Sequence, residues 1–420
     1  MAFYFENNIF NELIKKYPAW NELRNYLESD EGGLFRIVDT NDKGFCLIRY
    51  EKGISNMELP HSKWFRSVVW DTVKNLPLCV APPKTTSEIF PYNTIKEVLD
   101  AGVVCQELLE GFMINCFRVC DDNTLYITSR SKLNATGTFY SDKSFRDLFI
   151  ESYTNTNDTP NCIDTTFQDN LVHIQPPNAL NNEIAVFYSF LVQHKEHRIV
   201  KNIQNNRVYV IHSGIVYSDG RVLFNDSPPT FKGQLNIENI TLEQKPITGS
   251  YAQIISTTTN EVLRWTKDVL IEKDWQFQGL VFKDMSGNRW RFRSDKYSAI
   301  KSLRGNSSAI RDRFAQLYTQ NLLNKYLEYY PYEIVQFSSY IALMGNIVKL
   351  LYNNYVDLHI TKNKKVADID KMFLPHLYNI HGLYLTNLHP NGKKVNLTEI
   401  ILYLHKQPWQ RIAFLIKKTG

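Results

Sequence analysis

Two alternating arginines near residue 290 are the residues whose type and spacing most directly suggest chemistry. Arg291 and Arg293 stand two positions apart in RWRFRS, and residues two apart on a strand face the same side of a sheet. Lys283 lies just upstream, and the stretch 283–304 holds seven basic residues against two acidic ones. Such a strand face would bind phosphate groups. The alternative is a solvated edge strand, on which basic side chains discourage aggregation.

Five segments of the chain follow one another in a meaningful order. They are WFRSVVWDTVKNLPLCVAPPK at 64–84, QELLEGFMINCF at 106–117, YITSRSKLNATGTFY at 126–140, VFYSFLVQHKEHRIV at 186–200 and WQFQGLVFKDMSGNRWRFRSDKY at 275–297. Over about 64–304 this order resembles the covalent nucleotidyltransferases, and most closely the ATP-dependent RNA ligases of the phage T4 RNA ligase 1 group. The resemblance implies an α+β nucleotidyltransferase fold (ATP-grasp-like ligase fold) with antiparallel sheets, followed by a helical C-terminal domain.

The resemblance also implies that the family's catalytic groups are missing. The family's first motif is Lys-x-Asp-Gly, whose lysine attacks the nucleotide α-phosphate and forms a phosphoramidate. The matching residues 108–111 read LLEG, so that Leu108 stands at the position of the nucleophile. Two further family carboxylates, which help to hold a divalent metal, are replaced by Leu191 and Gln278. We therefore expect no catalytic residue at these degenerate positions and no metal site.

The phosphate-binding side of the family's pocket is retained. In the family, an Arg and a Lys upstream of the first motif contact the phosphates. Arg66 and Lys84 stand at the matching positions of this sequence. The alternative is that Arg66 is an ordinary arginine at the end of a strand and Lys84 an ordinary lysine in a turn. Arg291 and Arg293 match the two lysines of the fifth motif. The expected nucleotide- and phosphate-binding residues are Arg66, Lys84, Glu110, Gly111, Arg130, Lys132, Lys283, Arg291 and Arg293. No cofactor is certain, and the class that fits is ATP or another nucleotide with magnesium.

The hydrophobic pattern predicts the elements that would position these residues. Residues 1–30 are expected to be helical, and 34–300 to consist of strands with helices at 94–101, 143–153 and 259–270. Helices are expected at 307–330, 332–355 and 396–419, and a surface loop at 154–166. We expect three parts: 1–60, a helix and strands that complete the body; 61–305, the nucleotidyltransferase-like domain; and 306–420, a basic helical domain.

Composition and charge bound the class of protein. The 420 residues are 43% hydrophobic and 22% charged, which is ordinary for a soluble globular chain. The net charge of +5 is concentrated in 306–420, which hold 14 Lys and Arg against 7 Asp and Glu. This asymmetry favours a polyanion partner, and a solvated helical surface is the alternative. The six cysteines form no CxxC pair, and the first residues do not resemble a signal peptide. We expect a cytoplasmic protein without a membrane span, in the host cytoplasm if the chain is viral.

Three functions fit these observations. The first is an RNA ligase-like pseudoenzyme that binds a nucleotide, an RNA end or a cap in a basic pocket without forming a lysyl-nucleotide. The second is an active RNA ligase or repair enzyme, which uses a displaced nucleophile such as Lys84 or Lys132 or seals pre-adenylylated RNA. The third is an interaction scaffold with a vestigial pocket, whose C-terminal helices bind a protein partner. His194 and His197 in QHKEH lack a third ligand at a convincing spacing, so we interpret them as loop residues.

Overall fold

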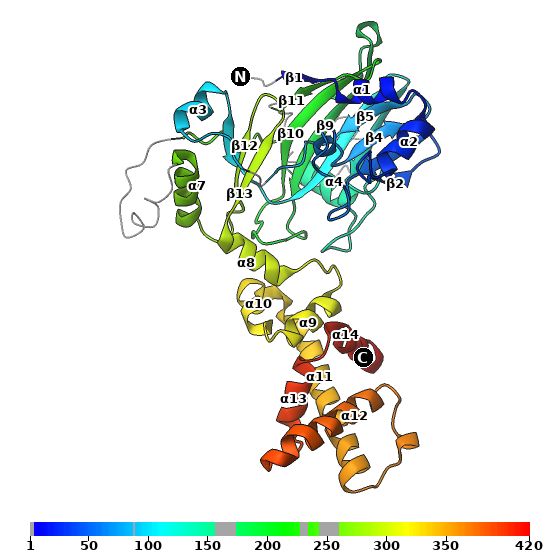
Figure 1. Ribbon diagram of the computed structural model, residues 1–420, viewed down its shortest axis with the longest axis vertical. Helices are drawn as coiled ribbons and strands as arrows, with labels where there is room; N and C mark the ends of the chain where they lie inside the picture. Colours follow the sequence, from blue (N-terminus) through cyan, green and yellow to red (C-terminus); the bar gives the residue numbers. More distant parts are fainter. Residues whose placement is uncertain (1–3, 87–88, 156–173, 227–233, 243–259) are drawn as a thin grey trace. The chain divides into compact units, whose positions relative to one another are not determined.

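The computed structural model describes residues 4–86, 89–155, 174–226, 234–242 and 260–420 (Figure 1). It divides into one unit that ends at Ser298 and a second unit, Ala299–Gly420. The first unit is mixed α and β with antiparallel sheets, and the second is helical, which confirms the coarse fold class. The predicted surface loop at 154–166 lies mostly outside the described residues.

A six-stranded antiparallel sheet forms the centre of the first unit (Figure 1). Its strands, in spatial order, are β1 (Tyr4–Asn7), β11 (Val222–Asn225), β10 (Arg207–Tyr217), β9 (Glu183–Gln193), β7 (Phe112–Val119) and β8 (Asp122–Ser129). Helix α4 (Phe145–Asn155) packs on one face, where Phe149 lies 5.6 Å from Phe190 between ring centroids. Because side chains alternate along a strand, Phe187 belongs to the core on the opposite face.

A four-stranded sheet and two helices share that second core. The strands are β2 (Arg36–Thr40), β3 (Phe45–Arg49), β4 (Val68–Asp71) and β5 (Leu76–Val80). Helices α1 (Ile9–Lys16) and α2 (Trp20–Glu28) contribute Phe10 and Leu23 to the core. The prediction of one helical segment over 1–30 was wrong at its start, where Tyr4–Asn7 pair with β11 as strand β1, and wrong in its continuity. The helix stops before Pro18, because the residue that precedes a proline is pushed out of the helical region, and Tyr17 is accordingly not helical.

A three-stranded sheet places the candidate binding residues. Its strands are β13 (Arg289–Arg293), β12 (Gly279–Lys283) and β6 (Val104–Glu107). One face packs against α3 (Ile95–Asp100) and α7 (Glu261–Glu272), which lie beside β12 and β13 in Figure 1, and Leu280, Phe282 and Trp290 belong to this core. The strand register places the intervening residues on the other face, in particular Val281, Lys283, Arg289, Arg291 and Arg293.

The second unit is built from helices around its own buried residues. They are the end of α8 (Asp295–Arg304), α9 (Ile310–Thr319), α10 (Leu323–Tyr329), α11 (Ile334–Tyr355), α12 (Leu374–Leu383), α13 (Leu397–His405) and α14 (Trp409–Thr419). The predicted helices at 307–330 and 396–419 are each split, the second because Pro408 caps a new helix. Length and apolar composition alone would allow Pro331–Ile360 to cross a membrane, a criterion that core helices of soluble proteins also meet.

A buried ion network ties four helices of the second unit together. Glu333 precedes α11, and its carboxylate accepts hydrogen bonds from Arg313 of α9 at 3.0 and 3.1 Å and from the Tyr326 hydroxyl of α10 at 2.9 Å. Arg304, at the end of α8, also pairs with Glu333. Such a group is satisfied only when all its members are in place, so it fixes the packing of these helices.

Candidate functional site

The three degenerate positions lie in one region of the first unit. The Leu108 N–H donates to the Gly279 carbonyl oxygen at 2.8 Å, and Gln278 directly precedes that glycine. Gly111 lies against Leu191, since a Cβ added to this glycine would stand 3.0 Å from the leucine Cγ. The structure therefore brings together Leu108, Leu191 and Gln278, which are far apart in sequence. None of them carries an ionisable side chain.

Glu110 is engaged with the protein's own backbone. Its side chain is 4% exposed, and its carboxylate accepts hydrogen bonds from the N–H groups of Ile199, Val200 and Lys201 at 3.0 to 3.2 Å. Gln193 holds the same segment by donating from Nε2 to the Glu110 carbonyl oxygen at 2.8 Å. Glu110 thus fastens the loop after β9 to the loop after β6. The arrangement gives this carboxylate a structural task that needs no nucleotide.

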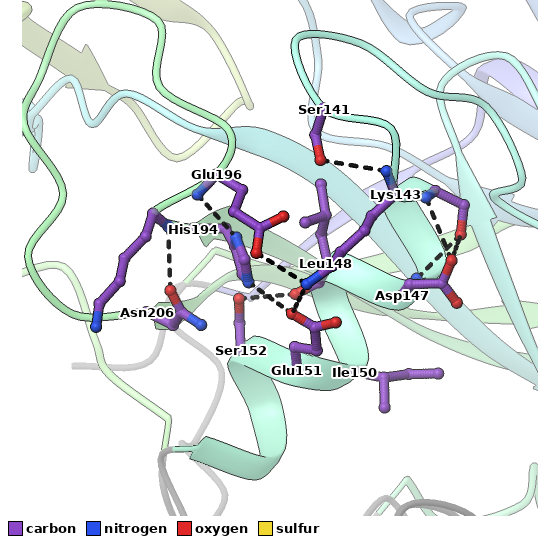
Figure 2. Close-up of polar contacts among 12 residues, drawn as sticks. Ser141, Lys143, Asp147, Leu148, Ile150, Glu151, Ser152, His194, Glu196 and Asn206 are labelled. Atoms are coloured by element: carbon purple, nitrogen blue, oxygen red, sulfur yellow. Dashed lines mark hydrogen bonds and ion pairs between the residues drawn. The ribbon is translucent and has the colours of Figure 1, made fainter. Parts of the chain in front are cut away.

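A polar group holds the start of the loop after β9 in place (Figure 2). Lys143 Nζ lies 3.0 Å from Glu151 Oε2 and 2.8 Å from Glu196 Oε1, and His194 Nε2 lies 3.1 Å from Glu151 Oε2. The Glu196 N–H donates to His194 Nδ1 at 3.1 Å, so the ring carries its proton on Nε2. Burial lowers the pKa of His194 and favours this neutral form. Within the described residues, no group of three or more His, Cys, Asp and Glu side chains could hold a metal ion.

A group of cationic side chains converges next to Tyr50 in the first unit. We call it the basic cluster, and its members are Arg66, Lys84, Arg130, Arg289 and Arg291. Arg130 Cζ lies 4.7 Å and Lys84 Nζ 5.5 Å from the centroid of the Tyr50 ring, distances at which a cation is attracted to an aromatic face. Burial, and after it the nearby charges of Arg289, Arg130 and Arg291, lower the pKa of Arg66 to about 10. Arg66 is therefore close enough to the other three guanidinium groups to be repelled by them.

The backbone around residue 85 explains how these side chains meet. After β5 the chain leaves the four-stranded sheet at Pro82 and Pro83. It then runs beside β13, where the Thr86 N–H donates to the Arg289 carbonyl at 2.8 Å and the Arg291 N–H donates to the Thr86 carbonyl at 3.0 Å. Lys84 is thereby carried next to the arginines of β13.

A pocket of about 470 Å³ opens at this place. The polar side chains that line it include those of Lys63, Lys84, Thr86, Asn288 and Arg289. Burial lowers the pKa of Lys63, whose Nζ donates to Asn288 Oδ1 at 2.6 Å. Of the basic cluster, Lys84 and Arg289 line this pocket, and its lining also includes one acidic residue, Glu58. The nitrogen donors of Lys63, Lys84 and Arg289 are groups that bind phosphate oxygens.

Only one cation of the basic cluster, Arg289, lies close to a carboxylate among the described residues. Asp226 is buried, its Oδ1 lies 2.9 Å from His212 Nδ1, and the charges of Lys283, Arg289 and His212 hold its pKa below the ordinary value against the opposing effect of burial. Arg289 and Lys283 are thus close to an anion. Within the part of the chain that the structure describes, Arg66, Lys84, Arg130 and Arg291 form no ion pair with a carboxylate. These four cations are what an anionic ligand would neutralise.

The remaining sequence-predicted residues occupy different surroundings. Lys283 is 4% exposed, and burial followed by the charge of Arg289 lowers its pKa to about 7. Arg293 lies on the same face as Arg291, which together with burial lowers its pKa. Lys132 is exposed and lies 3.4 Å from Asp39, and no contact with the basic cluster is present among the described residues. Lys132 therefore already has a carboxylate partner, whereas Arg66, Lys84, Arg130 and Arg291 pair with no carboxylate among the described residues.

The sequence reasoning missed three contributors to this site. The sequence shows Arg289 only as one of seven basic residues between 283 and 304. Arg289, Arg291 and Arg293 alternate along β13, so all three side chains belong to the same face of the sheet. Tyr50 and Asp226 carry no local signal, because their role comes from strands distant in sequence. Neither the models of known protein families nor the curated proteins gave a match to this chain. The likeness to RNA ligases therefore rests on the sequence motifs.

Proposed function

We propose that this protein is an RNA ligase-like pseudoenzyme, which binds the phosphates of a nucleotide or of an RNA 5′ end in the basic cluster without forming a lysyl-nucleotide. One observation carries the proposal. Four cations of the cluster, Arg66, Lys84, Arg130 and Arg291, have no carboxylate partner among the described residues, while the place of the family's nucleophile is taken by Leu108.

The energetics of the basic cluster support a phosphate ligand. Holding several guanidinium groups together in a partly desolvated site costs free energy, which is the meaning of the lowered pKa of Arg66. A phosphate group carries more than one negative charge and accepts several charge-assisted hydrogen bonds, so it would offset that cost for more than one arginine at once. A neutral ligand would leave the repulsion in place. The preference should therefore follow the charge on the ligand.

Two measurements test this function together. The protein is incubated with α-labelled ATP or GTP and magnesium or manganese, and no label should survive denaturing electrophoresis. Binding of one short RNA with a 5′-phosphate or a 5′-hydroxyl is then compared, and the phosphorylated RNA should bind more tightly. Arg66→Gln should reduce that difference, whereas Arg24→Gln, which removes an exposed arginine paired with Glu28 on α2, should not. Acid-labile label on the protein, or equal binding of the two RNAs, would contradict the proposal.

A second candidate function is nucleotidyl transfer to a displaced lysine. Its support is the pKa of Lys283, which burial lowers to about 7, so that much of this amine is neutral and nucleophilic near pH 7. Lys132 is paired with Asp39, which makes it a poorer candidate. The labelling experiment decides: label that is retained by the wild type and lost from Lys283→Met would replace the first proposal with this one. We place it second because Lys283 is nearly inaccessible.

A further inference from the structure

The last helix of the second unit, α14, exposes one side that carries an aromatic ring and three cations. Arg411, Phe414 and Lys418 follow one another at spacings of three and four residues, so they lie on the same side of the helix. Lys417 adjoins Phe414 by the same spacing. The Phe414 side chain is 49% exposed, and the three cations are exposed as well. We call these four residues the α14 face, and Phe414 stands in the middle of it.

The opposite side of α14 fixes this orientation. Ile412, Ala413, Leu415 and Ile416 are buried, where α14 packs against α9 and α11 (Figure 1). These apolar side chains belong to the interior of the second unit. They are therefore taken up by the fold, and only the α14 face is left for a partner.

The cations of the α14 face have no carboxylate close by in the helices that support them. Residues 400–420 contain four basic residues and no acidic one. Helix α11 has no acidic residue within its bounds, and Glu333, just before it, belongs to the buried ion network. Asp312 of α9 is already in an ion pair at 3.0 Å. Arg411 donates to a neutral acceptor, Gln407 Oε1, at 3.1 Å. These charges are therefore available to an anionic partner.

A single-stranded nucleic acid fits this combination better than a protein or a membrane does. Every base has a flat face that stacks on an aromatic side chain, and the phosphates beside it attract cations. A stable protein interface buries roughly 800 Å² per partner around an apolar centre, and a helix that lies in a membrane surface inserts a whole apolar side into the lipid. Among residues 409–419, Phe414 is the one large apolar side chain that is exposed. One ring is enough for a base and too little for the other two partners.

We propose that the α14 face binds single-stranded RNA, with one base stacked on Phe414 and the neighbouring phosphates held by Arg411, Lys417 and Lys418. The inference rests on the proposed function only in taking the nucleic acid to be RNA. It adds a second site, in the second unit, which needs no terminal phosphate. Because stacking is common to all bases, little sequence preference is expected. A strand whose bases are paired should bind less tightly, since those bases are not free to stack.

The first test measures stacking. Fluorescence anisotropy of the full chain follows the binding of a labelled unstructured RNA with a 5′-hydroxyl group, alone and annealed to its complement. Phe414→Ala should weaken binding of the single strand about tenfold, and Phe414→Trp should keep it. Tyr378→Ala is the matched control and should leave the affinity unchanged. Tyr378 is 55% exposed on α12, but no Lys or Arg stands three or four positions from it.

The second test measures charge, and it stays informative if Phe414→Ala does not fold. Lys417→Gln with Lys418→Gln should make the dependence of log K on log salt shallower by about 1.4, at about 0.7 per phosphate contact. Lys393→Gln with Lys394→Gln removes two exposed charges that flank no exposed aromatic ring and should leave the slope unchanged. Circular dichroism shows which variants keep their helices.

The outcomes separate this inference from the proposed function. Unchanged binding of the 5′-hydroxyl strand by folded Phe414→Ala would overturn the inference, and so would an equal loss in Tyr378→Ala. Binding of anionic phospholipid vesicles through Phe414, without binding of RNA, would overturn it in favour of a membrane. Equal binding of 5′-phosphorylated and 5′-hydroxyl RNA, with the Phe414 effect intact, would overturn the proposed function and leave the α14 face as an RNA site.

Discussion

Replacing both Arg291 and Arg293 by glutamine should weaken RNA binding and reduce its salt dependence. The two residues lie on one face of β13, and no carboxylate pairs with them among the described residues. Glutamine keeps hydrogen-bonding capacity but removes the charge, so the substitution tests electrostatic contact with phosphates. Binding to a polyanion releases condensed counterions, and the salt dependence of the affinity therefore counts the charged contacts.

The expected size follows from the number of cations in the site. The contacts counted are the four cations of the basic cluster without a carboxylate partner and Arg293, which lies outside the cluster on the same face of β13. If each of these five residues contacts one phosphate of a single strand, log K should fall with log salt with a slope of about −3.5, at about 0.7 per contact. Between about 50 and 200 mM salt the wild-type affinity should then fall roughly 100-fold. With two contacts removed the slope should be about −2, and the loss roughly 20-fold over the same range.

Fluorescence anisotropy of a labelled 5′-phosphorylated RNA, measured at several salt concentrations, gives these slopes. Arg291→Lys with Arg293→Lys keeps both charges and should retain a slope near that of the wild type. Circular dichroism of each variant shows whether the fold is kept. A glutamine variant that folds and binds RNA with an unchanged slope would refute the assignment of phosphate contacts to β13.

The remaining predictions concern buried charges. Asp226→Asn removes the anion close to Lys283 and Arg289 and should lower the free energy of unfolding by about 3 kcal/mol, measured by urea denaturation; an unchanged midpoint would exclude the pairing. Burial lowers the pKa of His194, so the unfolded chain binds that proton first, and stability should fall as the pH drops below about 6.5. His194→Gln should make that fall shallower, and an identical pH profile would count against the neutral ring that accepts from Glu196.

The fold could be predicted where local signals mark an element's ends. Helices expected at 94–101 and 259–270 correspond to α3 and α7, whose first turns are capped by Thr94 and Asn260. Continuity was harder to predict. Apolar spacing runs through 396–419 without a break, yet Pro408 divides the segment into α13 and α14. The spacing of apolar residues identifies the buried face of a helix. A break between two helices depends on a single residue, and the apolar spacing does not show where that residue lies.

The site was predictable only to the extent that its members share a strand or a motif. Arg291 and Arg293 were selected by alternation, which the register of β13 confirms as a shared face. The proximity of Arg130 to Tyr50 depends instead on how the four-stranded and six-stranded sheets pack, and no local pattern records that. The same holds for Asp226, which reaches Lys283 from the end of β11. Tertiary packing assembles the charges that sequence shows one at a time.

Gly111 and Gly279, on which the resemblance to ligases partly rests, are also required by the strands around them. A Cβ on Gly279 would stand 2.0 Å from the Phe292 carbonyl oxygen, and one on Gly111 would stand 2.5 Å from the Val192 carbonyl oxygen. Both contacts are with backbone, so neither position can accept a side chain without moving a strand. The packing of the strands alone therefore requires glycine at both positions, independently of any nucleotide chemistry. A glycine pair of this kind is evidence of shape, whereas evidence of chemistry has to come from the side chains between the two positions.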